Sequence, residues 1–250
     1  MYKNIFKGLL AYSRAFNLLS KLKLWKYFVI PIVISVFIAI LILVTAYGLS
    51  DNLGSLISRL WIWEWGKETF ETIGTFIGGF IIMVIGLILY KHTIMALSAP
   101  FMSPVSEKIE AYLTNADSVK RSTASFLTLL GRGIRINGRN LIKELILTVP
   151  LLLLKLIPFV NIFSAFLLFL LQAYYAGFGS MDYTLERHYM YKDSVRFVQK
   201  NRGLAIGNGI GFLLLLLIPI IGVIFVLPLS TTASTITTVE VLHSNQVSRK

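Results

Sequence analysis

The most regular chemical pattern in this sequence is a row of cations. Arg132, Arg135, Arg139 and Lys143 follow one another at intervals of three, four and four residues, so a helix would place all four on one face. Such a row can attract an anion toward a pore, and it can equally contact the phosphates of lipid headgroups. The spacing is compatible with both interpretations, and three glycines in the same segment weaken the prediction of a helix.

Two carboxylates precede this row. Glu107 and Glu110 lie one helical turn apart, and paired carboxylates can act as an acid and a base or can hold a cation. Nothing in the sequence suggests a bond to be cleaved, and Lys108 and Lys120 are near in the chain. We therefore expect these carboxylates to form structural ion pairs.

Polar residues inside apolar runs are a second kind of candidate. Lys155, Asn161 and Asn208 interrupt long apolar segments, and polar or ionisable groups within a membrane are candidates for a function. Lys155 could line a pore or a contact between subunits, or its long stem could carry the ammonium group to an interface. For Lys91, near the end of another apolar run, we expect the stem to reach the membrane surface in this way.

The sequence shows no sign of catalysis. It contains no cysteine, which excludes disulfides, thiol chemistry and cysteine-ligated metals, and its three histidines (His92, His188 and His243) are far apart. No nucleophile–base pair or metal-ligand spacing is visible. The glycine-rich stretch GLAIGNGIG at 203–211 has no Walker lysine, and small residues at helix–helix contacts explain it better. We expect neither an enzyme nor a bound cofactor or metal.

The composition indicates the environment of these residues. Of the 250 residues, 56% are hydrophobic and 14% are charged, and the mean hydropathy is +0.73, whereas a soluble domain has about 45–50% apolar and about 25% charged residues. The chain is therefore predicted to be an integral membrane protein. Its net charge of +12 is typical of basic loops that face an anionic cytoplasmic leaflet, so we expect no nucleic-acid partner.

Two segments are long and apolar enough to span a bilayer, whose core needs about 20 residues. They are 27–49, which carries no charge, and 73–99. Residues 1–26 mix basic and apolar residues and are predicted to form an amphipathic helix on the membrane surface. The Trp-rich segment between the spans is expected outside the cell, and the basic segments 100–144 and 180–202 are expected inside it.

Two similar stretches follow, LIPFVNIF at 156–163 and LIPIIGVIF at 217–225. In each, a proline (Pro158 or Pro219) ends a helix because its ring clashes with the carbonyl four residues back. Three residues later, Asn161 or Gly222 permits the reversal of the chain. Their segments, 145–178 and 203–243, are predicted to be helical hairpins that enter the bilayer without crossing it. The alternative is a pair of ordinary kinked or closely turning spans.

The chain also resembles the CysZ sulfate permease family, which is related to the eukaryotic etoposide-induced 2.4 membrane proteins. The resemblance covers nearly the whole chain and lies in four blocks: SAPFMSPVSEKIEAYLT (98–114), FGSMDYTLERH (178–188), RFVQKNRGLAIGNGIGF (196–212) and IPIIGVIFVLPLSTTAST (218–235). It implies an oligomeric inner-membrane protein with two long spanning helices and two hemi-penetrating hairpins. It also implies passage of sulfate into the cytoplasm to feed cysteine synthesis.

The resemblance extends to single residues. Glu107 and Glu110 match acidic positions of the family, and Asp182, Tyr183 and Arg187 match as well. We interpret the last three as a cytoplasmic cluster that braces the second hairpin.

The resemblance also implies an anion site, from which this sequence departs. Family members carry a Gly-Leu-Arg-Arg motif at the entry to the first span, where sulfate is thought to bind. The matching positions, counted back from Pro31, are Lys23, Leu24, Trp25 and Lys26. Arginine binds an oxyanion through a planar fork that lysine cannot reproduce, but lysines and free N–H groups at a helix start can still hold an anion.

Together these features predict an all-α integral membrane protein with two long transmembrane helices, two re-entrant hairpins and an amphipathic N-terminal helix. The expected function is that of a channel-like permease of the bacterial cytoplasmic membrane, which passes sulfate or a related small oxyanion without ATP hydrolysis. The alternative is a membrane scaffold or biogenesis factor of the same family without transport. The expected partners are the oxyanion, membrane lipids and further copies of the chain in a homo-oligomer.

Overall fold

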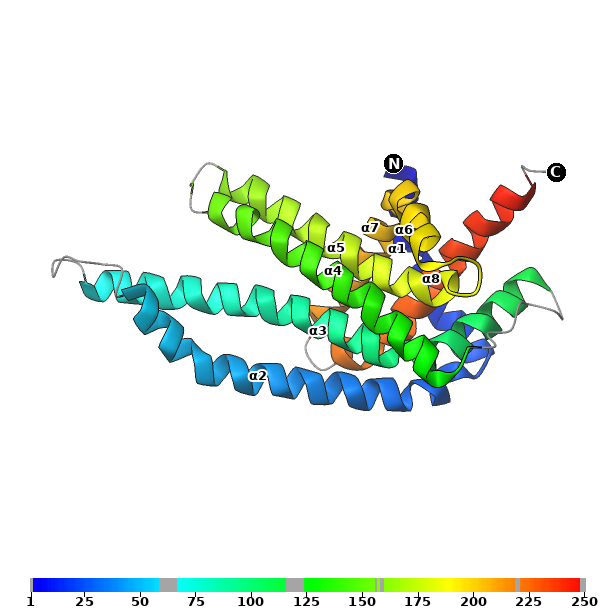
Figure 1. Ribbon diagram of the computed structural model, residues 1–250, viewed down its shortest axis with the longest axis horizontal. Coiled ribbons are helices and arrows are strands. Elements are labelled where there is room, and N and C mark those ends of the chain that lie inside the picture. The colour runs from blue at the N-terminus through cyan, green and yellow to red at the C-terminus, as the bar shows by residue number, and fades with distance from the viewer. Residues whose placement is uncertain are drawn as a thin grey trace.

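The computed structural model of the protein describes residues 2–58, 67–115, 124–155, 157, 160–218 and 221–247. Within these ranges the chain is helical and contains no strand (Figure 1). The elements in chain order are α1 (Tyr2–Lys21), the 3₁₀ helix η1 (Leu24–Phe28), α2 (Val29–Ser58), α3 (Lys67–Thr114), α4 (Phe126–Leu154), α5 (Asn161–Leu185), α6 (Tyr191–Lys200), α7 (Arg202–Leu216) and α8 (Ile221–Val247). The predicted all-α fold is confirmed.

Four stretches of the described chain are long and apolar enough to cross a membrane. They are Leu24–Thr45, Val84–Thr114, Asn161–Leu185 and Ile221–Ser244. α7, with 15 residues, is apolar but shorter. The chain is therefore a multi-pass membrane protein by the length and composition of its helices.

α1 is the amphipathic helix that the sequence predicts. Ala11, Ala15 and Leu19 are buried on one side, while Tyr2 and Phe6 are exposed on the other. The small buried residues allow a close approach, and α1 packs against α7 and α8. The helix thus presents a second, partly aromatic side away from the bundle.

α2 and α3 run antiparallel, side by side (Figure 1). α3 comprises 48 residues and continues to Thr114, beyond the end near residue 99 that the sequence predicts. Pro100 and Pro104 both lie inside it. Each proline removes one backbone hydrogen bond, which a packed bundle can tolerate in a long helix, and α3 packs against α4, α5 and α8 as well as α2.

The next elements form two helical hairpins, with the reversals where the sequence predicts them. α4 pairs with α5 and α7 pairs with α8, while Pro158 and Pro219 lie outside the described residues. α4 is longer than the apolar arm expected from residue 145, because it begins at Phe126 and continues through Pro150. The Ser125 hydroxyl caps its first turn by accepting a hydrogen bond from the Thr128 N–H at 3.3 Å. The depth of either hairpin in the membrane stays a prediction.

Gly222 allows the second reversal by its small size. Its N–H donates to the carbonyl of Ile218 at 2.8 Å, and a Cβ atom at this position would lie 2.1 Å from the carbonyl oxygen of Leu215. Its φ lies outside the left-handed region, so the glycine is needed for close approach rather than for an unusual backbone conformation. At the other reversal, Asn161 is the exposed first residue of α5.

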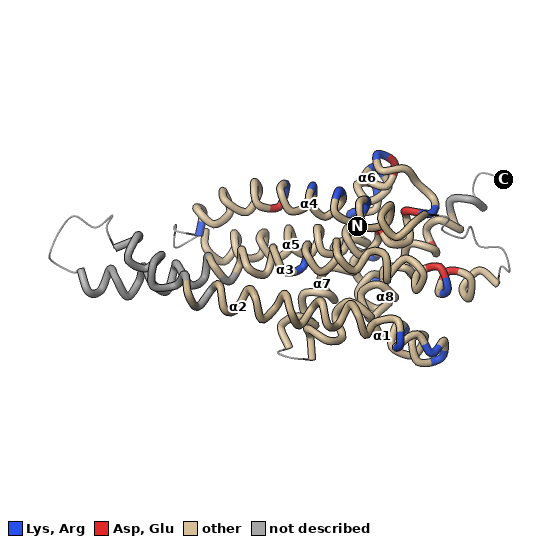
Figure 2. Tube along the Cα trace, turned by 60° about the horizontal axis from the view of Figure 1, so that its bottom comes forward, with Lys and Arg blue, Asp and Glu red and all other residues tan. Residues whose placement is uncertain are grey.

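The main core lies around α3, with contributions from η1, α5, α7 and α8. Among its buried members are Phe28, Ile94, Met102 and Phe212. Figure 2 shows that lysines and arginines gather around α1, α6 and the first half of α4, whereas the described part of α2 carries none. This separation is expected of a membrane protein whose basic residues lie outside its most apolar helix.

Candidate functional site

The residues between α1 and α2 form a short structured entry to the first long helix. Lys23 has a left-handed backbone conformation, with φ 53° and ψ 40°, and the turn η1 follows it directly. Leu24 and Phe28 from this turn are buried in the core at 2% and 0% exposure. Because these two side chains anchor the turn, Lys23 and Lys26 are left exposed on its outer side.

Trp25 also holds this entry in place. Its ring contacts Phe16 of α1 and Phe225 of α8 edge-to-face, with centroids 5.8 and 5.6 Å away. Its indole N–H donates to the Ser20 hydroxyl at 3.2 Å. Trp25 and Leu24 therefore position the segment, and the groups able to attract an anion are the neighbouring lysines.

Two further lysines, each bonded to a tyrosine, lie at this entry, and together with Lys23 and Lys26 we call these residues the lysine–tyrosine cluster. Lys21 Nζ donates to the Tyr112 hydroxyl at 2.7 Å, and Lys108 Nζ donates to the Tyr27 hydroxyl at 2.5 Å. Lys108 and Lys26 lie 4.4 and 5.5 Å from the centre of the Tyr27 ring. The place of Lys108 and Tyr112 at this entry was not predictable from the sequence, because only the continuation of α3 to Thr114 brings them there.

The cluster has the chemistry of an anion site. Its members are Lys21, Lys23, Lys26, Lys108, Tyr27 and Tyr112. Within the described chain, none of the four lysines forms an ion pair with a carboxylate. Their charges are therefore not neutralised there, and ammonium and phenol groups together offer several hydrogen-bond donors to an oxyanion.

The row of cations on α4 divides into two kinds of residue. Arg132 forms two hydrogen bonds with the Asp182 carboxylate, at 3.1 and 2.9 Å, and also donates to the Tyr189 carbonyl and the Ser194 hydroxyl. The helix predicted for this row is confirmed. Because Arg132 bonds to all of these groups, it joins α4 to α5 and α6. Its charge is paired with the Asp182 carboxylate.

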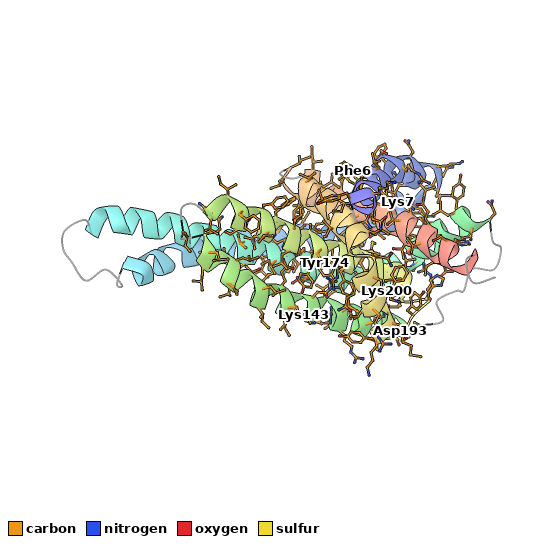
Figure 3. The ribbon with its side chains drawn as sticks, turned by 90° about the horizontal axis from the view of Figure 1, so that it is seen from above. Phe6, Lys7, Lys143, Tyr174, Asp193 and Lys200 are labelled. Atoms are coloured by element: carbon orange, nitrogen blue, oxygen red, sulfur yellow. The ribbon has the colours of Figure 1, made fainter. Side chains whose placement is uncertain are left out.

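The other members of the row lie toward the outer side of α4. The Arg135 guanidinium lies 4.2 Å from the centre of the Tyr191 ring, and that of Arg139 lies 5.3 Å from the centre of the Phe178 ring. Figure 3 shows Lys143 on the opposite side of the molecule from Lys7 of α1. Among the described residues, the arginines of the row contact α5 and α6 rather than the lysine–tyrosine cluster.

An ionic cluster formed by Glu110, Arg187 and His188 connects α3 with the end of α5. Glu110 Oε2 accepts from Arg187 at 2.7 Å, and Glu110 Oε1 lies 2.6 Å from His188 Nε2. Arg187 also donates to the Ser106 hydroxyl, and the Tyr183 hydroxyl donates to the Met95 carbonyl at 2.8 Å. These bonds tie α5 of the first hairpin to α3, while Glu107 lies half-buried one turn earlier on α3.

An open pocket of about 670 Å³ lies beside this cluster, lined by residues of α4 and of the segment that joins α5 to α6. Arg132, Arg135, Glu186, Arg187 and Tyr191 are among its lining residues. Burial raises the pKa of Glu186 to about 7. The pocket therefore combines fixed cations with one carboxyl group that is partly protonated near neutral pH.

The prediction that Lys91 reaches the membrane surface is wrong. Lys91 has no exposed surface, and its ammonium group donates to Glu144 Oε1 at 2.5 Å. Glu144 is itself fully buried and also bonds to His92. This pair could not be predicted from the sequence, because its members lie 53 positions apart, on either side of the turn from α3 to α4. A buried charge needs such a partner, since burial of an isolated ion is costly.

Lys155 follows the last residue of α4 as its C-cap. It lines a pocket of about 280 Å³ whose other walls come from α3, α5 and α7, among them Leu87, Leu168, Gln172 and Leu213. Lys155 is thus placed between the two hairpins, near the reversal of the first. A role in a pore or between subunits stays a prediction.

Comparison with known proteins agrees with this architecture. The model of the family described as Sulfate transporter CysZ/Etoposide-induced protein 2.4 matches residues 11–226. No curated protein sequence matches the chain. The matched region includes the lysine–tyrosine cluster, both hairpins as far as the start of α8, and the ionic cluster of Glu110 and Arg187.

Proposed function

This chain belongs to the Sulfate transporter CysZ/Etoposide-induced protein 2.4 family, and from that membership we propose that it is a permease for sulfate or a related small oxyanion. It would act in the bacterial cytoplasmic membrane as a homo-oligomer and pass the anion into the cytoplasm. No nucleotide-binding motif occurs in the sequence, so the proposed passage is channel-like and uses no ATP hydrolysis.

The observation that carries this proposal is the lysine–tyrosine cluster at the entry to α2. Among the described residues, it places ammonium groups from α1, η1 and α3, none of them paired with a carboxylate, around two phenols. Lys23 and Lys26 occupy positions of the family's sulfate motif, and Lys21 and Lys108 add two charges beside them. A cluster of like charges favours a divalent anion at this point of the membrane surface.

The replacement of arginine by tryptophan and lysine bears on the choice of anion. A guanidinium group fixes two oxygens of an oxyanion in one plane, whereas an ammonium group is a point charge without preferred geometry. Trp25 is packed between two phenylalanine rings and supplies no positive charge. We therefore expect this protein to discriminate less sharply among tetrahedral oxyanions than an arginine-bearing relative would.

Radiolabelled sulfate binding to the purified protein tests the proposal. We expect saturable binding in competition with sulfite and phosphate, and a loss of affinity of about tenfold or more for Lys26→Ala and for Lys108→Ala, because each removes a charged hydrogen-bond donor. Lys192→Ala, on the exposed side of α6, is the matched control and should leave the affinity unchanged.

Two outcomes would remove parts of the proposal. Unchanged affinity in both lysine variants would exclude the cluster as the binding site. Absence of sulfate binding together with absence of uptake in proteoliposomes would exclude transport and favour a membrane scaffold of the same family.

A further inference from the structure

A groove of about 660 Å³ lies between α1 and α8 and has no part in the proposed anion site. The two helices pack against each other along it, and Figure 3 shows Phe6 and Lys7 of α1 together on this side of the molecule. The residues of the groove that matter for its chemistry are charged or large and apolar, and they are Lys3, Phe6, Lys7, Leu10, Arg14 and Glu240.

Cations outnumber carboxylates in this groove. Lys7 Nζ lies 2.9 Å from Glu240 Oε2, and the Arg14 guanidinium donates to Glu240 Oε1 at 2.9 Å. Lys3 has no carboxylate partner among the described residues. Three cations and one carboxylate give the lining a net charge of +2, so the groove attracts anions.

An exposed apolar strip lies beside these cations on α1. Lys3, Lys7 and Arg14 are separated by four and seven residues, which brings them to one side of the helix. Phe6 and Leu10 each precede or follow a cation of that side by no more than four positions, and their exposures are 63% and 65%. A helix that combines cations with large exposed apolar side chains has the two properties that bind a lipid, whose phosphate is anionic and whose chains are apolar.

The position of the groove along α8 agrees with the level of lipid headgroups. α8 is long and apolar enough to cross a membrane, and Glu240 is its first charged residue. Ile236 also lines the groove, and it lies about 22 Å along the helix from Ile221, at 1.5 Å per residue. A membrane helix places its first charged residue toward the headgroups, so the cations of α1 are expected at the same level.

We propose that this groove is a binding site for an anionic glycerophospholipid of the surrounding bilayer. The lipid phosphate pairs with Lys3 and takes donors from Lys7 and Arg14, and an acyl chain covers Phe6 and Leu10. A zwitterionic lipid would leave the positive charge of the lining uncompensated, and a small soluble anion would leave the apolar strip bare. Because Glu240 accepts from Lys7 and Arg14, its carboxylate competes with the lipid phosphate.

Photolabelling of the full chain in lipid nanodiscs tests the proposal. Nanodiscs of phosphatidylcholine receive a trace of a probe with a diazirine on its acyl chain, either phosphatidylglycerol or phosphatidylcholine, and mass spectrometry locates the labelled residues. We expect phosphatidylglycerol to label residues 2–14 at least about fivefold more than phosphatidylcholine, because each basic residue near the surface favours an anionic lipid by about this factor. Residues 33–44 of α2, which contain no charged residue, are the internal reference and should be labelled equally by both probes.

Two variants should move this ratio in opposite directions. Lys3→Ala should lower it by about fivefold, and it removes no ion pair of the described chain. Glu240→Gln should raise it, because the carboxylate that competes for Lys7 and Arg14 is gone. If the cations served only to fasten α1 to α8, Glu240→Gln would not raise it. Lys192→Ala, which removes an exposed cation of α6, is the matched control and should leave the ratio unchanged.

Three outcomes would overturn the proposal. They are equal labelling of residues 2–14 by both probes, a ratio that stays the same or falls in Glu240→Gln, and loss of the labelling when excess glycerol phosphate is added. The last result would identify a site for a soluble anion instead. The first and the last come from the unsubstituted chain, so they hold even where a variant fails to fold. None of these measurements depends on sulfate binding or transport.

Discussion

Glu186 follows the last residue of α5 and lines the pocket beside α4. Its Oε1 is buried and has no hydrogen-bond partner within the described chain. Burial raises the pKa of this carboxyl group to about 7, and the Asp182 carboxylate adds to the rise while Arg187 and Arg132 oppose it. In the unfolded chain the pKa has its ordinary value near 4.5. Between these two values the folded protein binds more protons than the unfolded one.

The stability of the protein should therefore fall as the pH rises from about 4.5 to about 7, through this residue. Glu186→Gln removes the ionisable group, so we expect the variant to be more stable than the unsubstituted protein by about 2–3 kcal/mol at about pH 8. The difference should vanish below about pH 5. Unfolding in mixed detergent micelles at both pH values measures it, and an equal difference at both values would attribute the effect to packing.

Single residues were predictable from sequence where spacing along one helix decides their placement. The row from Arg132 to Lys143 is an example, because its intervals alone put it on one side of α4. Lys91 and Glu144 were not predictable, since their pairing depends on how α3 and α4 meet. The same holds for Lys108 and Tyr27, which join α3 to the entry of α2. Residues that are far apart in the sequence cannot be predicted to pair, even when each of them is recognised as a candidate by itself.

α7 is an element whose shape depends on glycine. A Cβ atom at Gly209 would lie 1.6 Å from the Ala173 carbonyl oxygen of α5, and one at Gly207 would lie 2.1 Å from the Ile5 carbonyl oxygen of α1. α7 thus contacts helices on both sides at backbone distance, which is the use of small residues expected in membrane helices. The glycine-rich stretch was interpreted in this way from the sequence, and the structure confirms it.

Gly209→Ala should therefore destabilise the protein although alanine favours a helix. The added methyl group meets backbone atoms that cannot rotate away, and overpacking of this kind costs about 1–3 kcal/mol or more. Gly138→Ala is the matched control, because a Cβ atom on that glycine of α4 meets no atom within 4 Å, and it should stabilise by up to about 1 kcal/mol. Thermal unfolding of the two variants in the same detergent measures both effects, and equal stabilities would contradict the packing argument.

At the scale of elements the sequence predicted the order of the helical segments and both reversals, but it predicted two long spanning helices, whereas α5 and α8 are also long and apolar enough to cross a membrane. Apolar run length and the position of proline were sufficient for this. The ends of α3 and α4 were placed less well, because polar residues such as Ser103, Ser106 and Asn137 continue a helix when they face a partner helix rather than water. Which side of α3 and α4 is buried depends on the neighbouring helices of the bundle. The spacing of residues along the sequence does not contain this information.

In the whole molecule, the turn of the first hairpin and the far end of the long pair lie at different levels along the molecule (Figure 1). Figure 1 shows α2 and α3 extending farther along the molecule than the turn between α4 and α5. From Lys143, the last cation of the row, α4 continues to Leu154, which is about 16 Å at 1.5 Å per residue. α7 measures about 22 Å over its 15 residues. Both outgoing arms are shorter than a hydrocarbon core of about 30 Å, whereas the return helices α5 and α8 are long enough to cross it.

From the short outgoing arms we predict that each hairpin turns inside the bilayer, and the absence of cysteine from the sequence makes this measurable. We expect single cysteines at Asn161 and Leu217, near the two reversals, to react with an impermeant thiol reagent added outside the cell at least about tenfold more slowly than one at Glu64. Glu64 lies in the segment expected outside the cell and beyond the described residues. Lys192→Cys on α6 should react only after the membrane is opened. If either reversal reacts as fast as position 64, that hairpin crosses the membrane, and the unpaired backbone groups of its turn face water rather than protein.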